Sequence, residues 1–412
     1  MRIAYVCHYF PPEPAAPAAR VHEFARAWVR AGNDVSVITT FPNHPLGRIP
    51  LAYRGRFWST ERLDGIKVLR CWLYAVANRG VGRRGLDHLS FMLSALVFGL
   101  PRLPPVDVVV ASSPTLFSAV AASLIARLRR VPFVLEVRDL WPAAMVSLGL
   151  MRPGVAVRTL EHLARFLYAQ AARVVVVTEA FADRLEADGV PRSKLAVIPN
   201  GADTRLFSPL ADGSACRAAL DLQGRFVVAY VGSHGLSHGL SAVLDAASAQ
   251  PDVTYLLVGD GADRDRLLAE RERRQLGNVI MRPSVARSDV PGVYAAADVC
   301  LVPLRDVPLF EAFVPSKLFE VLAAGRPVVG AVRGEAREIL VRSGAALLVE
   351  PERGDQIAAA VSRLRADPAL RAELSRRGRA FAEQHYSRDA LAVRYLDLLH
   401  DVVATGRATP CR

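Results

Sequence analysis

One segment in the second half of the sequence places a serine, a lysine and a glutamate at the start of a predicted helix. Ser316, Lys317 and Glu320 fall in a helix predicted over Ser316–Ala324, after a strand predicted over Val299–Pro303. Free N–H groups at a helix start attract anions, and the lysine adds a positive charge there. We expect Ser316 to cap the helix and Glu320 to accept two ribose hydroxyls. The segment indicates either a nucleotide diphosphate site or an ordinary capped helix with a solvated lysine and glutamate.

Two glycine-rich loops in the same half of the chain follow predicted strands. Gly232–Gly239 contains Ser233 and His238, and Gly259–Gly261 follows the next strand. Glycines after parallel strands let the backbone approach a ligand at the carboxyl ends of a sheet, although many such turns carry glycine for geometry alone. Neither loop has the G-x-G-x-x-G spacing and distant acidic residue of a nicotinamide site, and the sequence has no Walker A motif.

In the first half, charged residues gather at the end of a predicted strand. The strand over Pro132–Glu136 leads into Arg138 and Asp139. Charges at this edge of a sheet either position a ligand or pair with each other, and pairing is the default expectation. We expect His8 and His44 to be ordinary loop histidines. No H-x-x-x-H pair falls on a predicted helix and no C-x-x-C pair occurs, so the sequence predicts no metal site.

Residues 48–84 combine nine basic residues with two acidic ones. Aromatic residues are interleaved with the arginines: Tyr53, Phe57, Trp58, Trp72 and Tyr74 with Arg48, Arg54, Arg56, Arg62, Arg70, Arg79, Arg83 and Arg84. An uncharged apolar helix is predicted next, over Leu89–Leu100. This combination, residues 48–100, suits an anionic membrane surface; the alternative is that the helix is core and the arginines are solvated. Nucleic acid is not expected, because no recognised binding module accompanies the patch.

The candidate site residues are connected by a regular pattern of secondary structure, because the sequence predicts strands that alternate with helices. The remaining predicted strands are Ile3–Val6, Asp34–Thr39, Val106–Ala111, Arg173–Thr178, Ala196–Pro199, Phe226–Val231, Thr254–Val258, Val279–Met281, Pro327–Gly330 and Ala346–Val349. Helical patterns between them imply parallel sheets covered by helices, hence an α/β fold. Turn residues near 190–215 predict a linker. We expect an N-terminal domain over 1–195, a C-terminal domain over 196–385, and a final helix and tail over 386–412.

Composition narrows the class of protein. The chain has 412 residues, 51% of them hydrophobic, which suits packed domains and excludes a disordered or fibrous chain. We expect no signal peptide and no spanning helix, and five scattered cysteines fit a reducing, cytoplasmic setting. The net charge is +12 with only three lysines, so part of the basicity reflects genome composition. The local excess over residues 48–84 instead indicates an anionic partner.

Six motifs occur in a set order along nearly the whole chain. They are Tyr9–Glu13 with Arg20, Thr39–Pro45 with Gly47, Arg138–Pro142, Pro199–Asp203 with Phe207, Gly259–Gly261, and Pro315–Glu320. The set resembles the retaining glycosyltransferases of family 4, which have the GT-B fold. It resembles more closely the bacterial O-antigen and capsule subgroup that includes fucosamine transferases of the WbuB type.

The resemblance implies two Rossmann-like domains facing a central cleft, with the last helix crossing back onto the N-terminal domain. It implies that Glu320 holds the ribose, that Ser316, Lys317 and Leu318 meet the diphosphate, and that Arg282 lies near the base. The other donor-side candidates are Gly232, Ser233, His238, Gly259 and Gly261. Arg138, Asp139 and Glu311 are the catalytic candidates, and Glu13, Ala16 and Arg20 belong to the acceptor-side loop.

This sequence departs from the family at three places: one of two glutamates is shifted, Ser233–His238 stand where many members have arginine and lysine, and Ala15–Ala19 replace a glycine-rich loop. Members often carry two glutamates with seven residues between them, and the partner position for Glu320 is Ala312, one place after Glu311. The resemblance implies a metal-independent hexosyltransferase that uses a nucleotide sugar, with UDP-sugars first, and no other cofactor. We expect the acceptor to be a hydroxyl of a lipid-linked saccharide in surface polysaccharide synthesis, at the inner face of the plasma membrane. The alternatives are a soluble natural-product acceptor, a nucleotide-sugar 2-epimerase and a non-catalytic nucleotide-sugar binder.

Overall fold

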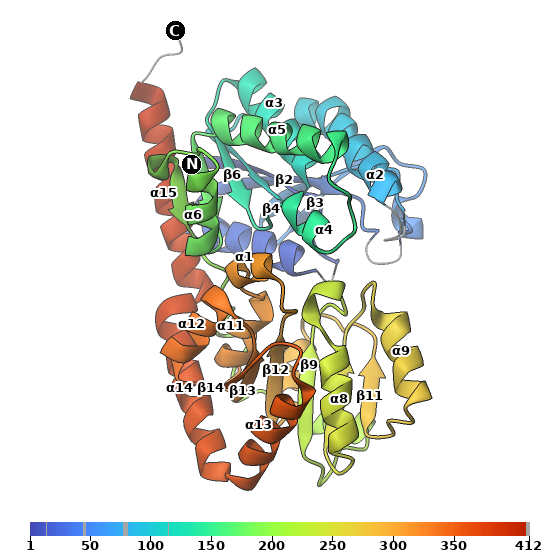
Figure 1. Cartoon of the computed structure of the whole chain (residues 1–412). Coiled ribbons are helices and arrows are strands. Elements are labelled where there is room, and N and C mark those ends of the chain that lie inside the picture. The colour runs from blue at the N-terminus through green and yellow to red at the C-terminus, as the bar shows by residue number, and fades with distance from the viewer. Residues whose placement is uncertain (14, 44–46, 77–80, 114, 409–412) are drawn as a thin grey trace. The chain divides into compact units, whose positions relative to one another are not determined.

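The chain forms two compact units, each built on its own sheet. The computed structural model describes residues 1–412 apart from 14, 44–46, 77–80, 114 and 409–412 (Figure 1). The N-terminal unit comprises Met1–Pro199 together with Asp389–Arg412, and the C-terminal unit comprises Asn200–Arg388. His44, Pro45 and Arg79, which were named above, lie outside the described residues.

The N-terminal unit contains an eight-stranded sheet with the order β3-β4-β2-β1-β5-β6-β7-β8. Its strands are β1 (Arg2–Val6), β2 (Asp34–Thr40), β3 (Trp58–Leu63), β4 (Ile66–Cys71), β5 (Val108–Ser112), β6 (Phe133–Val137), β7 (Arg173–Val176) and β8 (Leu195–Val197). All neighbouring strands are parallel except β3, which pairs with β4 in the antiparallel sense. Parallel strands buried on both faces explain the continuous apolar runs that predicted them.

Helices cover both faces of this sheet, with α3 and α5 on one side and α1 on the other (Figure 1). They are α1 (Ala16–Arg30), α2 (Val81–Ser94), α3 (Leu116–Arg129), α4 (Ala143–Ser147), α5 (Val155–Gln170), α6 (Glu179–Ala187) and α15 (Arg388–Ala408). The last helix packs on the same core as α1: the Tyr395 ring meets Phe24 and Trp28 edge-on, at centroid distances of 5.6 and 5.3 Å. The Trp28 indole donates to the carbonyl oxygen of Ala392 at 2.9 Å. The predicted return of the final helix to the N-terminal domain is therefore confirmed.

The structure corrects the secondary structure expected between residues 48 and 100. Strands β3 and β4 form a hairpin that the sequence did not predict, because β3 is a half-exposed edge strand rich in polar residues. The helix predicted over Leu89–Leu100 instead begins at Val81 and ends at Ser94, and a π-turn follows over Ala95–Gly99. Gly99 packs where a Cβ atom would lie 3.1 Å from Ile38, so the chain passes close to the sheet at that point.

The C-terminal unit contains a six-stranded, wholly parallel sheet with the order β11-β10-β9-β12-β13-β14. Its strands are β9 (Val227–Val231), β10 (Thr254–Val258), β11 (Val279–Arg282), β12 (Val299–Pro303), β13 (Val328–Ala331) and β14 (Ala346–Val349). Its helices are α7 (Ser214–Ala219), α8 (Ser241–Ala249), α9 (Arg264–Arg273), α10 (Val290–Ala296), α11 (Ser316–Ala323), α12 (Gly334–Ser343), α13 (Gly354–Ala366) and α14 (Pro368–Tyr386). Residues of α8, α9 and α13 share one hydrophobic core with the strands. The predicted α/β architecture with two parallel sheets is confirmed.

The packing of α15 generates a stability prediction. The Tyr395 side chain of α15 is fully buried against α1, whereas Val393, also on α15, is 57% exposed. We expect Tyr395→Ala to lower the free energy of unfolding of the N-terminal unit by about 3–5 kcal/mol, the cost of deleting a large buried aromatic side chain. The matched change Val393→Ala should stay within about 0.5 kcal/mol of the parent.

Urea denaturation followed by tryptophan fluorescence measures this effect, because all four tryptophans lie in the N-terminal unit. Equal midpoints for the parent and Tyr395→Ala would show that α15 does not stabilise that unit.

Candidate functional site

The strand order of the C-terminal sheet reverses between β9 and β12. The chain runs outward from β9 through β10 to β11, then returns to pair β12 with the other edge of β9. Loops that leave neighbouring strands in opposite directions create a crevice at the carboxyl ends of the strands, where ligands bind in open α/β sheets. The first glycine loop follows β9 at this place, and α11 lies beyond β12.

The two glycine loops contact each other directly. A Cβ atom on Gly259 would lie 1.8 Å from the Gly232 carbonyl oxygen, and one on Gly261 would lie 2.4 Å from that of His234. Backbone hydrogen bonds join the loops: Gly232 N–H donates to Val258 and His234 N–H to Asp260, both at 2.9 Å. Close backbone packing is therefore sufficient to explain Gly259 and Gly261, which the sequence associated with the donor.

Lys317 occupies the first turn of α11 and points beneath the first glycine loop. A Cβ atom on Gly232 would lie 2.8 Å from the end of the lysine chain, so glycine makes room for it. The ammonium lies 3.6 Å from the centre of the Tyr230 ring and has no hydrogen-bond acceptor among the described residues. Burial holds the pKa of Lys317 well below its usual range, and Glu320 opposes that shift only partly. Lys317 is therefore buried, in contrast to the solvated lysine of an ordinary capped helix.

The start of α11 differs from the prediction in its cap. Pro315 is the N-cap residue and Ser316 is the first helical residue, with no side-chain capping bond. The proline preceding the helix occupies the position that a capping serine would take. Leu318 is fully buried, so only its backbone can serve a ligand. The first N–H groups of α11 therefore lack the competing side-chain acceptor that we expected.

Two histidines share the surroundings of Lys317. Burial, followed by the charge of Lys317, lowers the pKa of His234 to about 4 and holds that of His238 well below its ordinary value. Neither ring nitrogen of His234 has a hydrogen-bond partner within the described part of the chain. Sequence reasoning named His238 and missed His234, although the H-x-x-x-H spacing inside a glycine loop was a visible signal. A bound anion would offset the unfavourable burial of all three groups.

Glu320 is paired in this structure. Its Oε1 atom accepts from the Arg287 guanidinium at 2.9 Å, and its Oε2 atom lies 3.4 Å from the Tyr294 hydroxyl. Arg287 also stacks 5.1 Å from the centre of the Phe207 ring. Arg287 and Tyr294 were not among the residues singled out from the sequence, because they lie on a separate loop and helix.

The remaining donor-side candidates are more dispersed. Arg282 ends β11 and is exposed, and Ser233 is exposed with its carbonyl oxygen accepting the Tyr230 hydroxyl at 2.5 Å. Glu311 is exposed in a short turn over Pro308–Ala312. Its backbone is held close to Gly334, where a Cβ atom would lie 2.1 Å from the Glu311 carbonyl oxygen. The structure thus groups Gly232, His238 and Lys317 closely, while Arg282 lies at the end of the sheet's edge strand.

In the N-terminal unit, Arg20 takes part in a fully buried ion pair. Its guanidinium donates to Glu136 at 2.7 Å and to the carbonyl oxygens of Ile198 and Pro199 at 2.8 and 2.7 Å. Tyr5 donates to the other oxygen of Glu136 at 2.6 Å. Burial alone would raise the pKa of Glu136, but Arg20, Arg138 and the Tyr5 hydroxyl together hold it below its ordinary value. This arrangement joins α1, β6 and the end of β8, so Arg20 acts within the core rather than at a loop surface.

Asp139 follows β6 in an apolar setting. Burial raises its pKa to about 6, while the backbone N–H of Leu140 and the charge of Arg138 act in the opposite direction. The Arg138 backbone N–H donates to the Ser113 hydroxyl at 2.9 Å. The buried Glu13 accepts from the Asn43 backbone N–H at 2.9 Å, and Ala16 begins α1. A carboxyl group with a pKa near 6 can exchange a proton near neutral pH.

Comparisons with known families match both units. Residues 16–201 match the family described as glycosyl transferase 4-like domain, and residues 224–367 match the family described as glycosyl transferases group 1. The putative colanic acid biosynthesis glycosyl transferase WcaI of Escherichia coli is 28% identical over 81% of this chain and 85% of its own length. The 2-deoxystreptamine glucosyltransferase of Streptomyces kanamyceticus is 27% identical over 74% of this chain and 80% of its own.

Solved structures share the fold. Sucrose-phosphate synthase from Thermosynechococcus elongatus superposes with a TM-score of 0.75 at 21% identity, covering 98% of this chain and 100% of that one. Anabaena HepE, solved in complex with UDP and glucose, superposes with a TM-score of 0.73 at 18% identity, covering 97% and 99%. These likenesses establish the GT-B fold that the sequence predicted.

Lys317 generates a prediction with a defined pH dependence. We expect Lys317→Met to raise the free energy of unfolding of the unliganded C-terminal unit by about 1–3 kcal/mol at pH 7, because it removes a buried amino group that has no hydrogen-bond acceptor among the described residues. The pKa of Lys317 is lower in the folded than in the unfolded chain, so the unfolded chain binds more protons below about pH 10.4. The parent protein therefore gains stability as the pH rises, and the advantage of the variant should shrink toward pH 10.

Urea unfolding followed by circular dichroism, at about pH 7 and about pH 9.5, measures both quantities. The exposed Arg273 on α9 provides the control, since Arg273→Met should change stability by less than about 0.5 kcal/mol. A Lys317→Met variant that is less stable than the parent at both pH values would contradict this account of the lysine.

Proposed function

We propose that this GT-B chain is a glycosyltransferase that moves a sugar from a nucleotide diphosphate donor to a hydroxyl acceptor with retained configuration. The matches of residues 16–201 to the glycosyl transferase 4-like domain and of residues 224–367 to glycosyl transferases group 1 support a glycosyltransferase. The observation that carries the proposal is the buried Lys317 ammonium. It lies at the start of α11, under a glycine loop, and has no hydrogen-bond acceptor among the residues that the structure describes. A diphosphate bound there would receive the lysine charge and the free N–H groups of the helix.

This arrangement addresses the main chemical demand of the reaction. When the bond from the sugar to the diphosphate breaks, negative charge develops on the departing phosphate oxygen. Donors that are fixed in place before the reaction stabilise that charge, and Lys317 with the first turn of α11 would supply them without a metal ion. The bond to the acceptor hydroxyl forms on the same face of the sugar, and its proton passes to the leaving phosphate.

Glu320 is our candidate for the ribose. Its carboxylate is held by Arg287 and Tyr294, so it is already oriented and partly withdrawn from water. Donor binding would replace or share these contacts with two hydroxyls. Because Arg287 neutralises the glutamate, the exchange costs less than stripping a solvated carboxylate. Glu311 and Arg282 remain our candidates for contacts to the sugar and the base.

In the N-terminal unit, we assign Asp139 and Arg138 to the sugar or the acceptor. The raised pKa of Asp139 would allow its carboxyl group to hold or accept a proton near neutral pH. Glu13, in the loop before α1, and Ala16, the first residue of α1, are assigned to the acceptor side. Arg20, in contrast, would support that loop through its buried pair with Glu136.

A UDP-sugar is the donor that we propose first. Anabaena HepE, which shares the fold, has been solved with UDP and glucose. We further propose that the acceptor is a lipid-linked saccharide in surface polysaccharide synthesis, of the O-antigen or capsule type. The relationship to WcaI supports this choice. The relationship to the 2-deoxystreptamine glucosyltransferase favours a second candidate, a soluble natural-product acceptor.

We also propose that residues 48–100 contact a membrane surface, through a smaller set of residues than the sequence predicted. No helix in the described part of the chain is long and apolar enough to cross a membrane. Arg70 is buried and paired with Glu61, so it does not belong to a membrane-facing patch. The exposed apolar side chains of residues 48–100 are Leu51, Phe57, Trp58, Trp72, Tyr74, Leu86, Leu93 and Val97. With the exposed arginines 48, 54, 56, 62 and 83, they fit a peripheral contact with the inner face of the plasma membrane.

Donor binding can be tested by a thermal-shift comparison of UDP, GDP, ADP and dTDP and their sugars. We expect one nucleotide class to raise the melting temperature, since a ligand at 100 times its Kd stabilises by about 2.7 kcal/mol. Lys317→Ala and Glu320→Ala should abolish the shift, whereas the exposed Glu272→Ala should retain it. Asp139→Ala should retain the shift and lower kcat by about 100-fold or more. A shift that survives in both site variants would place the donor elsewhere.

Membrane binding can be tested by sedimentation with anionic vesicles. We expect the protein to sediment at about 0.05 M salt and to be released at about 0.5 M, because salt screens the arginines. The double change Leu93→Ser and Val97→Ser should reduce the bound fraction several-fold, while Leu210→Ser, in the C-terminal unit, should not. No sedimentation at low salt would favour the soluble acceptor.

A further inference from the structure

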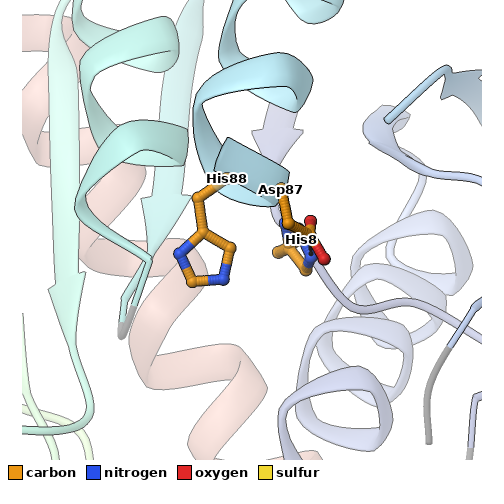
Figure 2. A group of neighbouring side chains, drawn as sticks. All are labelled: His8, Asp87 and His88. Atoms are coloured by element: carbon orange, nitrogen blue, oxygen red, sulfur yellow. Dashed lines mark ion pairs between the residues drawn. The ribbon is translucent and has the colours of Figure 1, made fainter. Parts of the chain in front are cut away.

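Three side chains that commonly bind metals meet in the N-terminal unit. His8 follows β1, and Asp87 and His88 lie in the middle of α2, so the cluster combines distant parts of the chain. One ligand atom of each lies within 4.8 Å of the others. Figure 2 shows Asp87 and His88 descending from the same stretch of helix, with His8 beside the carboxylate. Sequence spacing gave no sign of this cluster, because 78 residues separate His8 from Asp87.

The separations are close to those of a coordinated ion. The His8 Nε2 and Asp87 Oδ1 atoms are 3.3 Å apart, and the rings of His8 and His88 are edge-to-face at a centroid distance of 4.8 Å. In a tetrahedral site with bonds of about 2.0–2.1 Å, ligand atoms lie about 3.3 Å from one another. The first pair already has this spacing. The ligand atoms of the whole cluster lie within 4.8 Å of one another, so His88 must approach the other two by up to about 1.5 Å when an ion binds.

The cluster is incompletely satisfied without an ion. The Nδ1 atom of His8 and the Oδ1 atom of Asp87 have no hydrogen-bond partner among the residues that the structure describes. Both side chains are more than nine-tenths buried. The partly exposed pair of His22 and Asp64, by contrast, is joined by a 2.8 Å hydrogen bond. Buried polar atoms normally find partners, so the unsatisfied atoms at His8 and Asp87 need an explanation.

The types of the three ligands narrow the choice of ion. One carboxylate and two imidazoles are the ligands that borderline ions such as Zn²⁺ prefer, whereas Mg²⁺ and Ca²⁺ prefer oxygen.

We propose that His8, Asp87 and His88 form a binding site for a divalent transition-metal ion, with Zn²⁺ or Co²⁺ as the fitting occupant and one coordination position open. The ion would join the loop after β1 to α2. His8 lies where the strand order of the N-terminal sheet reverses, since β1 pairs with β2 on one side and with β5 on the other. The inference does not depend on the proposed transferase reaction, and it revises the expectation of no metal site.

The experiment is a titration of the full-length, tag-free protein with Co²⁺, followed by visible absorption. We expect one Co²⁺ per chain with the spectrum of a low-symmetry, four-coordinate site, displaced by one equivalent of Zn²⁺. Zn²⁺ should also raise the melting temperature of the protein. His88→Ala and Asp87→Asn should each weaken binding by about 100-fold or more, the second with little change in side-chain shape.

The matched control is His22→Ala, which removes the other histidine–aspartate pair and should leave the Co²⁺ affinity unchanged. Circular dichroism establishes that each variant is folded. The proposal is overturned if the parent binds no stoichiometric Co²⁺, or if folded His88→Ala and Asp87→Asn bind it as tightly as the parent. It is equally overturned if His22→Ala loses the site, because the ion would then be at the surface pair.

Discussion

The C-terminal unit buries a lysine whose ammonium has no hydrogen-bond acceptor in the described part of the chain. The Lys317 ammonium lies under a loop that must be glycine at position 232, and it faces the Tyr230 ring. Two histidines beside it are kept neutral by burial and by the lysine charge. A folded protein tolerates such a group only if packing elsewhere compensates for its cost. The parallel sheet and its shared helix core provide that packing, and the site is thereby ready for an anion before one arrives.

The N-terminal unit also buries a charged side chain, but there the charge is paired: Arg20 lies against Glu136. Arg20 and Glu136 neutralise each other, and the remaining guanidinium N–H groups bind carbonyl oxygens at the end of the unit's last strand. Removing one partner would leave the other charge buried, which typically costs about 3–5 kcal/mol. The pair therefore fixes α1 relative to the sheet. The loop before α1 has its own attachment, because Glu13 accepts a hydrogen bond from the Asn43 backbone N–H.

The sequence predicts those features of the structure that depend on residues close together in the chain. Thr254–Val258, Val299–Pro303 and Ala346–Val349 occur as strands with the predicted bounds, because buried parallel strands are short apolar runs. The lysine and glutamate of α11 were also found from local spacing. Arg287, which pairs with Glu320, and the cluster of His8 with Asp87 were not, because tertiary packing alone brings them together. The β3–β4 hairpin was missed since its polar edge strand resembles a solvated loop.

The position of α15 has a consequence for the order in which the protein folds during synthesis. The core of the N-terminal unit includes Tyr395 and Leu399, near the end of the sequence, yet its strands end at Val197. A ribosome therefore releases all of the C-terminal unit before the first unit can complete its core. Until α15 emerges, Trp28 and Phe24 lack the surface that covers them in the folded molecule. The growing chain thus carries an incompletely covered first domain while residues 200–388 are made, and a chaperone has exposed apolar surface to bind during that time.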